Sequence, residues 1–414
     1  MARTTNWPTV RLEEVCEYIT VGHVGPMVEE YRESGVPFLR SQNVRPYRFD
    51  PSDLKFISSD FHAKLRKSAL RPNDVVVTRS GANTGQCCII PPRLAEANCS
   101  DLVIFRPSDR LNPWFLMYVL NSDWGRATIA GGVVGAAQHH FNIGIAKRLT
   151  VQLPPLFIQQ RIAAILSAYD TVLENNQRRI RILDAMALSL YREWFVNFRF
   201  PGHEKVKVKT VDGRKVPDAW QVKNLFDLAD VTYGFPFKSK LFSEDKGGIP
   251  VVRIRDIVSS STETFTTELA DEKYLLRNGD LLVGMDGDFH MGKWSGGKAY
   301  QNQRVVRFRP KDNLSLCYLF LAIQKPINHF DATIVGTTVA HLSDRDLRSI
   351  ELMIPDRETF KRAESILNPC YESEINLALQ NSNLRETRDL LLPRLISGEI
   401  SVEHLETEAL SALS

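Results

Sequence analysis

The sequence predicts an α+β protein of mixed α/β character, with two similar globular domains separated by two long helices that form an antiparallel coiled coil. The chain has 414 residues, 43% of them hydrophobic, and single cores rarely grow past roughly 250 to 300 residues. One pattern of short apolar runs occurs twice, and a long helical pattern follows each copy. The expected order is a domain at 1–155, a helix at 156–200, a domain at 201–355, and a helix with a C-terminal tail at 356–414.

The repeat consists of four ordered matches whose offset shrinks along the chain, as expected if the second copy has shorter loops. Glycine, proline, arginine and the apolar positions coincide in these matches. The first copy contains Gly35–Val44, Leu70–Val77 followed by Gly81, Phe105-Arg106-Pro107, and His140 with Pro154; the second contains Gly248–Ile257, Leu276–Val283 followed by Gly287, Phe308-Arg309-Pro310, and His341 with Pro355.

Short runs rich in Val, Ile and Leu, bounded by Gly, Pro, Asn and Asp, indicate the strands of each copy. One helix per copy follows them. The expected strands are 36–40, 75–78 and 102–106 in the first copy and 249–254, 281–284 and 304–308 in the second; the expected helices are 113–121 and 315–324.

The first long helix is predicted from a run without glycine or proline between Leu156 and Phe200, flanked by Pro154-Pro155 and Pro201-Gly202. A helix of that span is about 65 Å long. Its apolar positions, Val172 and Met186 among them, step by four and three, which is the period of a coiled-coil seam.

The second long helix has a weaker pattern, and Pro369 is expected to kink it or delay its start because proline lacks an amide donor. Both predicted seams carry polar residues, Asn176 in the first and Glu374 and Asn381 in the second, which favours a defined register between the two helices. The alternative is two independent surface helices, each covering its own domain.

Charge and cysteine content narrow the function classes. The net charge is +3, which neither requires nor excludes nucleic acid, because basic residues can gather on one face. Six scattered cysteines include no C-x-x-C pair, so a structural zinc site is not expected. No apolar run approaches the roughly 18 residues of a membrane span, and we expect a soluble, cytoplasmic protein without a metal site.

Two related domains on an antiparallel helix pair would share the approximate two-fold symmetry of duplex DNA. Candidate DNA-reading residues lie in the loops between the strands, because Arg, Asn and Gln recognise base edges by paired hydrogen bonds. They are Arg40, Gln42, Asn43, Arg79, Ser80, Asn83, Thr84, Gln138, His139 and His140 in the first domain, and Lys238, Lys240, Arg253, Arg255, Asp288, His290, Lys293, Thr338 and His341 in the second.

Two other function classes remain open from the residues. Gly287–Lys293 fits the phosphate-loop pattern G-x-x-x-x-G-K, which would suit a nucleotide-binding enzyme, but Trp294 follows it where a Ser or Thr is required, and the first-copy loop has no lysine. We find no catalytic signature elsewhere. The third class is a coiled-coil scaffold with no DNA role.

Several segments together resemble the specificity subunits of type I restriction-modification enzymes over nearly the whole chain. They are Trp7-Pro8 with Leu12, Pro37 with Arg40, Ser80–Gly85, Leu153–Leu156 followed by Gln159–Ile162, Tyr191–Phe195, and the stretch Leu391–Ile400.

The resemblance implies two target recognition domains that each bind half of a bipartite sequence in double-stranded DNA. It implies that the chain itself is not an enzyme and has no cofactor of its own. Its partners would be two copies of a methyltransferase (modification) subunit and restriction/translocase subunits, which would use S-adenosylmethionine, ATP and magnesium. Pro369, and Pro355-Asp356-Arg357 where the first copy has Pro154-Pro155-Leu156, depart from the pattern and put in doubt equal docking on both helices.

Overall fold

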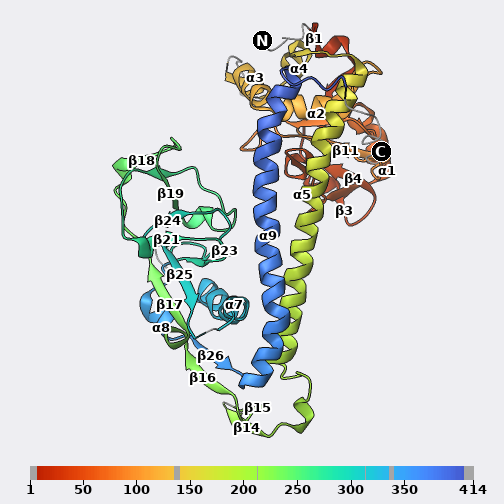
Figure 1. Ribbon diagram of the computed structural model, residues 1–414. Coiled ribbons are helices and arrows are strands. Elements are labelled where there is room, and N and C mark those ends of the chain that lie inside the picture. Colours follow the sequence, from red (N-terminus) through yellow and green to blue (C-terminus); the bar gives the residue numbers. More distant parts are fainter. Residues whose placement is uncertain (1–6, 135–139, 212, 313, 335–339, 405–414) are drawn as a thin grey trace. The chain divides into compact units, whose positions relative to one another are not determined.

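The computed structural model describes residues 7–134, 140–211, 213–312, 314–334 and 340–404 (Figure 1). The chain divides into two compact units, Met1–Leu173 with Leu384–Ser414, and Glu174–Asn383. Each unit contains one α+β domain and a part of each long helix. The strands and helices expected from the sequence are confirmed at nearly the predicted positions.

In the first unit the domain is built from thirteen strands and four helices among the described residues. The strands are β1 Thr9–Arg11, β2 Cys16–Val21, β3 Tyr31–Arg32, β4 Val36–Leu39, β5 Val44–Arg45, β6 Arg48–Phe49, β7 Lys55–Ile57, β8 Ala69–Leu70, β9 Val75–Thr78, β10 Cys87–Ile89, β11 Ala97–Cys99, β12 Leu102–Pro107 and β13 Thr150–Gln152. The helices are α1 Ser59–Lys64, α2 Pro113–Asn121, α3 Asp123–Val134 and α4 Ile143–Arg148.

The domain of the second unit has the same plan with fewer helices described. Its strands are β14 Val208–Val211, β15 Arg214–Pro217, β16 Gln221–Asn224, β17 Ala229–Tyr233, β18 Phe242–Ser243, β19 Ile249–Val252, β20 Phe265–Thr266, β21 Leu275–Leu276, β22 Leu281–Gly284, β23 Met291–Lys293, β24 Ala299–Gln301, β25 Val305–Pro310 and β26 Glu351–Ile354. Its helices are α6 Leu225–Leu228, α7 Leu316–Thr333 and α8 Asp344–Arg348.

Sheet topology confirms the internal repeat. The four-stranded sheet has the order β10-β9-β12-β2 in the first domain and β23-β22-β25-β17 in the second. The five-stranded sheets run β3-β7-β4-β11-β8 and β18-β20-β19-β24-β21, and in each the fourth strand pairs parallel with the third. The two copies therefore share one frame.

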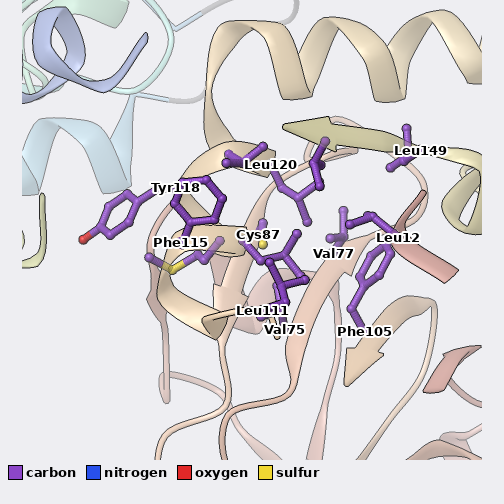
Figure 2. Packing of buried hydrophobic residues seen from close by; sticks show 14 of the residues in the cluster. Leu12, Val75, Val77, Cys87, Phe105, Leu111, Phe115, Tyr118, Leu120 and Leu149 are labelled. Atoms are coloured by element: carbon purple, nitrogen blue, oxygen red, sulfur yellow. The ribbon is translucent and has the colours of Figure 1, made fainter. Parts of the chain in front are cut away.

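The four-stranded sheet is buried on both faces, which explains why its strands are continuous apolar runs. In the first domain Val75, Val77 and Phe105 pack toward α2 in one cluster (Figure 2). The residues between them, Val76 and Ile104, belong to a second cluster on the opposite face. Alternation along each strand thus divides the apolar side chains between two cores.

Helix α2 starts where its caps predict. Asn112 Oδ1 accepts the Phe115 amide at 3.0 Å, and Pro113 occupies the first helical position. In the second domain Ser315 caps α7 in the same way, but α7 continues to Thr333, past the predicted end and through Pro326.

The long helix α5 spans Leu156–Tyr191 and is shorter than the predicted run to residue 200. One π-helical turn, Arg192–Val196, follows it. The reason is tertiary: the Phe195 and Phe200 rings pack on the buried Trp220, with ring centroids 5.8 and 5.5 Å away. An aromatic cluster ends the helix without glycine or proline.

Helix α9 spans Arg357–Ile396 without interruption, so the expectation that Pro369 delays its start is wrong. Asp356 Oδ1 accepts the Thr359 amide at 2.9 Å and fixes the first turn upstream of the proline. Buried Leu367 and Cys370 on either side of Pro369 hold that segment against the domain.

Helices α5 and α9 pair antiparallel within each unit. In the first unit Asp170 contacts Arg388 at 2.5 Å, and in the second Asn176 Nδ2 donates to Asn381 Oδ1 at 3.1 Å. The predicted seam is only partly correct. Val172 is 44% and Met186 53% exposed, whereas their neighbours Leu173 and Ala187 are buried, so the buried stripe shifts by one residue.

Among the described residues, no helix combines the length and apolar character needed to cross a membrane.

Candidate nucleic-acid interface

The candidate interface is the edge of each domain at which five strands meet, which we call the strand-end edge. In the first domain β2, β4, β9 and β11 end there and β12 begins there. Backbone hydrogen bonds link the five chain segments: Gly22 N to Leu102 O at 2.7 Å, His23 N to Cys99 O at 2.8 Å, Ser100 N to Leu39 O at 3.0 Å, Arg79 N to Asp101 O at 3.3 Å and Phe141 N to Arg79 O at 3.1 Å.

The second domain repeats these hydrogen bonds one for one. They are Gly234 N to Val305 O at 3.1 Å, Phe235 N to Gln301 O at 2.9 Å, Asn302 N to Val252 O at 3.1 Å, Met285 N to Arg304 O at 2.9 Å and Leu342 N to Met285 O at 2.8 Å. The matching pairs define which residues of the two edges are equivalent, independently of the sequence match.

Glycine is required where the first of these hydrogen bonds forms. A Cβ at Gly22 would meet the carbonyl oxygen of Cys99, and one at Gly234 would meet that of Asn302. Gly234 belongs to the basic and aromatic stretch 233–240, for which the first copy has no evident sequence match. The backbone shows that Gly22-His23 is its counterpart.

At the first edge, the predicted residues Arg79 and Ser80 both face Asp101. Ser80 Oγ donates to Asp101 Oδ2, and Arg79 Nη1 lies 4.0 Å from Asp101 Oδ1. The Arg79 side chain is 17% exposed, while that of Asp101 is 42% exposed. His140, in the segment that Phe141 ties to the edge, is exposed.

At the second edge, Asp286 joins two cations. Its Oδ2 lies 3.0 Å from Arg304 Nε, and its Oδ1 lies 2.6 Å from Nδ1 of the predicted residue His341. Arg304 is 53% and His341 46% exposed. His341 and His140 hold equivalent places, each directly before the residue that bonds to the β22 or β9 loop.

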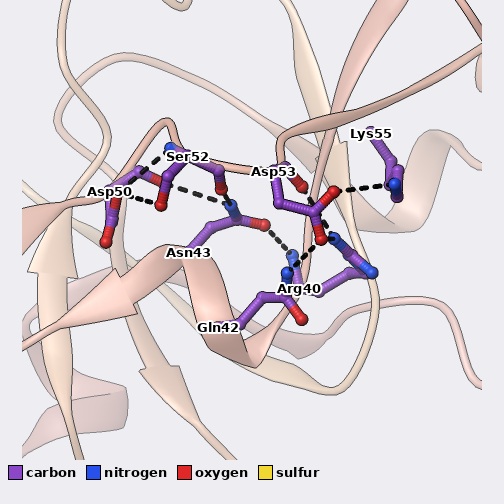
Figure 3. A network of polar contacts seen from close by, with 7 residues as sticks. All are labelled: Arg40, Gln42, Asn43, Asp50, Ser52, Asp53 and Lys55. Carbon is purple, nitrogen blue, oxygen red and sulfur yellow. Dashed lines mark hydrogen bonds and ion pairs between the residues drawn. The ribbon is translucent and has the colours of Figure 1, made fainter. Parts of the chain in front are cut away.

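Arg40 and Gln42, which follow β4, are held by the carboxylate of Asp53 (Figure 3). Arg40 Nη2 donates at 2.7 Å, Gln42 Nε2 at 2.6 Å and Lys55 Nζ at 2.7 Å. Hydrogen bonds from Lys55, Arg40 and Gln42 keep the pKa of Asp53 well below its ordinary value. The carboxylate therefore neutralises donors that would otherwise be free for phosphate.

Asn43 has a structural role. It is fully buried, accepts the Arg40 amide at 3.0 Å, and donates to Asp50 O and Ser52 O. Asp256 does the same for Arg253 in the second domain, accepting its amide at 2.9 Å. The Arg253 guanidinium donates to the hydroxyl of Thr264, and Arg255 is 69% exposed.

The remaining predicted residues are spread over loops. Asn83 Oδ1 accepts from Gln86, and Thr84 Oγ1 donates to Gly81 O at 2.6 Å, so both shape the β9–β10 turn. In the β22–β23 turn Asp288 is exposed and His290 half-buried. Lys238 lies 3.8 Å from Glu268, and Lys240 is exposed. Gln138, His139 and Thr338 lie outside the described residues.

Lys293 lies on the helix side of the second domain. Its side chain is 8% exposed; Nζ is 2.9 Å from Asp184 of α5 and also pairs with Glu374 of α9. Burial alone would lower the pKa of Lys293, but Glu374 and Asp184 outweigh it and raise the pKa. The lysine of the G-x-x-x-x-G-K segment is thus already paired, which disfavours the nucleotide-binding alternative.

Sequence reasoning missed four residues of these clusters: Asp53, Asp101, Thr264 and Arg304. Asp101 and Arg304 each stand directly before a buried strand, a position that could have marked them. Within the described part of the chain, no group of three or more His, Cys, Asp or Glu side chains is arranged to hold a metal ion.

Residues 4–183 and 217–383 match the family described as the type I restriction modification DNA specificity domain. The match covers most of the chain, which therefore belongs to this family. It is a specificity subunit: the component that recognises DNA sequence, and not a catalytic one.

The MjaIX specificity subunit of a type I restriction enzyme from Methanocaldococcus jannaschii is 23% identical over 97% of this chain and 95% of its own length. The EcoBI specificity subunit from Escherichia coli is 29% identical over 45% of this chain and 41% of its own. The crystal structure of a type I S subunit from M. genitalium, 16% identical, covers 95% of this chain and 96% of its own with a TM-score of 0.55, and supports the fold alone.

Proposed function

We propose that the chain reads a bipartite target in double-stranded DNA, with the strand-end edge of each domain binding one half-site. The observation that carries this proposal is the repeat of five backbone hydrogen bonds at both edges, combined with different side chains on them. One frame with two sets of side chains suits two different half-sites. Backbone-linked loops on a rigid sheet are a common place for binding residues.

The partners follow from the family. The chain would act in the cytoplasm with two copies of a methyltransferase subunit and with restriction/translocase subunits, and bring both activities to its target. S-adenosylmethionine, ATP and magnesium would be bound by those partners. A scaffold without a DNA role would assemble the same partners but leave methylation without sequence preference.

The test is to sequence genomic methylation in cells with and without this chain. The expected result is one gapped motif that disappears when the chain is deleted. The variant Arg79→Ala with Asn83→Ala should lose or relax one half-site only, since a good base contact gives about 1–3 kcal/mol of discrimination. Methylation without a gapped motif would contradict the proposal.

A matched control is Arg110→Ala. Arg110 is an exposed cation that follows β12 at the end of the strand away from the edge. This variant should keep both half-sites. Loss of one half-site in the control would mean that any loss of positive charge, and not the edge, decides recognition.

A further inference from the structure

The two strand-end edges carry opposite charges at one equivalent position. The backbone hydrogen bond of Arg79 N to Asp101 O corresponds to that of Met285 N to Arg304 O. Asp101 and Arg304 are therefore equivalent, and so are their contact residues Ser80 and Asp286, which directly follow the two donors. A carboxylate in the first domain stands where the second has a guanidinium.

In both domains the charged group at this position is the exposed member of its pair. Asp101 is 42% exposed and the Arg79 that faces it only 17%. Arg304 is 53% exposed and the Asp286 that faces it only 28%. The less exposed partner has the opposite sign in each case, so each edge presents one charge outward and supports it from behind.

The supporting contacts orient these groups. Ser80 Oγ donates to Oδ2 of Asp101, which leaves Oδ1 with only the longer contact to Arg79. Asp286 contacts Arg304 through Nε, so the two Nη groups of the guanidinium can make a bidentate contact. Asp286 also accepts from His341, and this second bond fixes the carboxylate that positions Arg304.

We infer that Asp101 and Arg304 read one base pair each at corresponding places in the two half-sites, Arg304 a guanine and Asp101 the amino group of a cytosine. Arginine pairs with O6 and N7 of guanine, and a carboxylate accepts from N4 of cytosine, in the major groove. The phosphate backbone is the same in both half-sites, so a position whose charge is inverted between the domains suits a base better than a phosphate. The inference rests on the proposed function.

The first experiment replaces Arg304 by Ala in the full chain, assembled with its methyltransferase partner, and sequences genomic methylation. We expect preference for guanine at one position of one half-site to fall by ~10- to 100-fold, with every other letter unchanged. Arg304→Lys should restore part of it. Lys325→Ala, which removes an exposed cation on α7, is the control and should leave the motif unchanged.

The reciprocal experiment grafts the second edge onto the first. Ser80→Asp with Asp101→Arg should convert the corresponding position of the other half-site from cytosine to guanine, and the single variant Asp101→Asn should only relax it. Both positions are at least partly exposed, and thermal melting of each variant identifies any loss of folding.

The outcomes separate the two proposals. A wild-type chain that directs no gapped motif contradicts the proposed function. A wild-type gapped motif that persists in Arg304→Ala, or that changes at several positions or in both half-sites, overturns the assignment of Arg304 alone. If Arg304→Ala weakens methylation equally at all sequences and reduces its salt dependence, Arg304 contacts phosphate instead.

Discussion

The two domains are joined to helices α5 and α9 by buried ionic clusters of opposite design. In the first unit the cation belongs to a helix: Arg388 of α9 contacts Asp170 of α5 and lies 4.1 Å from the Tyr47 ring centroid. The domain contributes only phenols, since Tyr118 Oη donates to Asp170 at 2.6 Å. In the second unit the cation, Lys293, belongs to the domain, and both helices contribute carboxylates.

The aromatic surroundings are alike although the charges are not. Lys293 Nζ lies 4.4 Å from the Phe320 ring centroid and 5.1 Å from that of Tyr371. Lys293 also ends β23, the strand that returns from the exposed turn with Asp288 and His290. The equivalent residue of the first copy, by its place in the sheet register, is the buried Ile89.

The difference predicts unequal tolerance. Asp170 keeps a neutral donor, Tyr118, if its cation is lost. Asp184 and Glu374 share one cation and would face each other without it. Removing one member of a buried charge cluster costs much more than the intact cluster contributes, because the remaining charges are left uncompensated. The second unit should be the more sensitive of the two.

The largest expected effect is that of Lys293→Met. It leaves two carboxylates beside each other in a largely buried site and should lower the free energy of unfolding of the second unit by about 3–5 kcal/mol. Denaturant unfolding of the full chain measures it. Adding Glu374→Leu and Asp184→Asn should recover most of the loss, and no recovery would show that the lysine acts through packing alone.

The second prediction concerns pH. Burial raises the pKa of Glu374 from 4.5 to about 7, although Lys293 opposes the shift. Because the folded pKa lies above the unfolded one, this group stabilises the fold fully below pH 4.5, and the contribution is lost as the pH rises through 7.

Glu374→Gln keeps an acceptor for Lys293 but cannot ionise. The difference in melting temperature between this variant and the wild type should therefore favour the variant increasingly from pH 5 to pH 8, by up to about 2–3 kcal/mol given ~1.4 kcal/mol per pKa unit. A difference that does not vary with pH would contradict a raised pKa.

A smaller loss is expected for Arg388→Met, about 2 kcal/mol, which is typical of a lost hydrogen bond to a charged group. Asp170 would retain the hydrogen bond from Tyr118, and burial, the main cause of its raised pKa, favours its neutral form. Adding Tyr118→Phe should make the loss greater than the sum of both single changes. Strict additivity would argue against a shared site.

The smallest effect is expected at the seam. Asn176→Leu leaves the Asn381 amide without its partner in a buried position and should cost about 1 kcal/mol. The pair Asn176→Leu with Asn381→Leu should be neutral or stabilising, because two apolar side chains fill a seam well. Destabilisation by the double variant equal to the sum of the single ones would contradict this role of the amides.

The sequence by itself determined the duplicated frame and the long helices. Strands such as 75–78 and 281–284 are continuous apolar runs because the sheet is buried on both faces, so composition alone marks them. Caps such as Asn112 act through their own neighbours and are readable locally. Pro369 misled because a distant cap and burial of the adjacent turns outweigh one missing amide donor.

Only the tertiary structure decided which polar residues form the candidate interface. Residues 40, 79, 101 and 140 come together because β4, β9 and β11 end at one edge, a consequence of strand order that no local pattern specifies. The tertiary structure also turned Asn43 into a buried brace and Lys293 into a helix contact, although both had the residue type of a DNA ligand. The physical reason is that a polar side chain's role depends on its partners, and those partners lie far away along the chain.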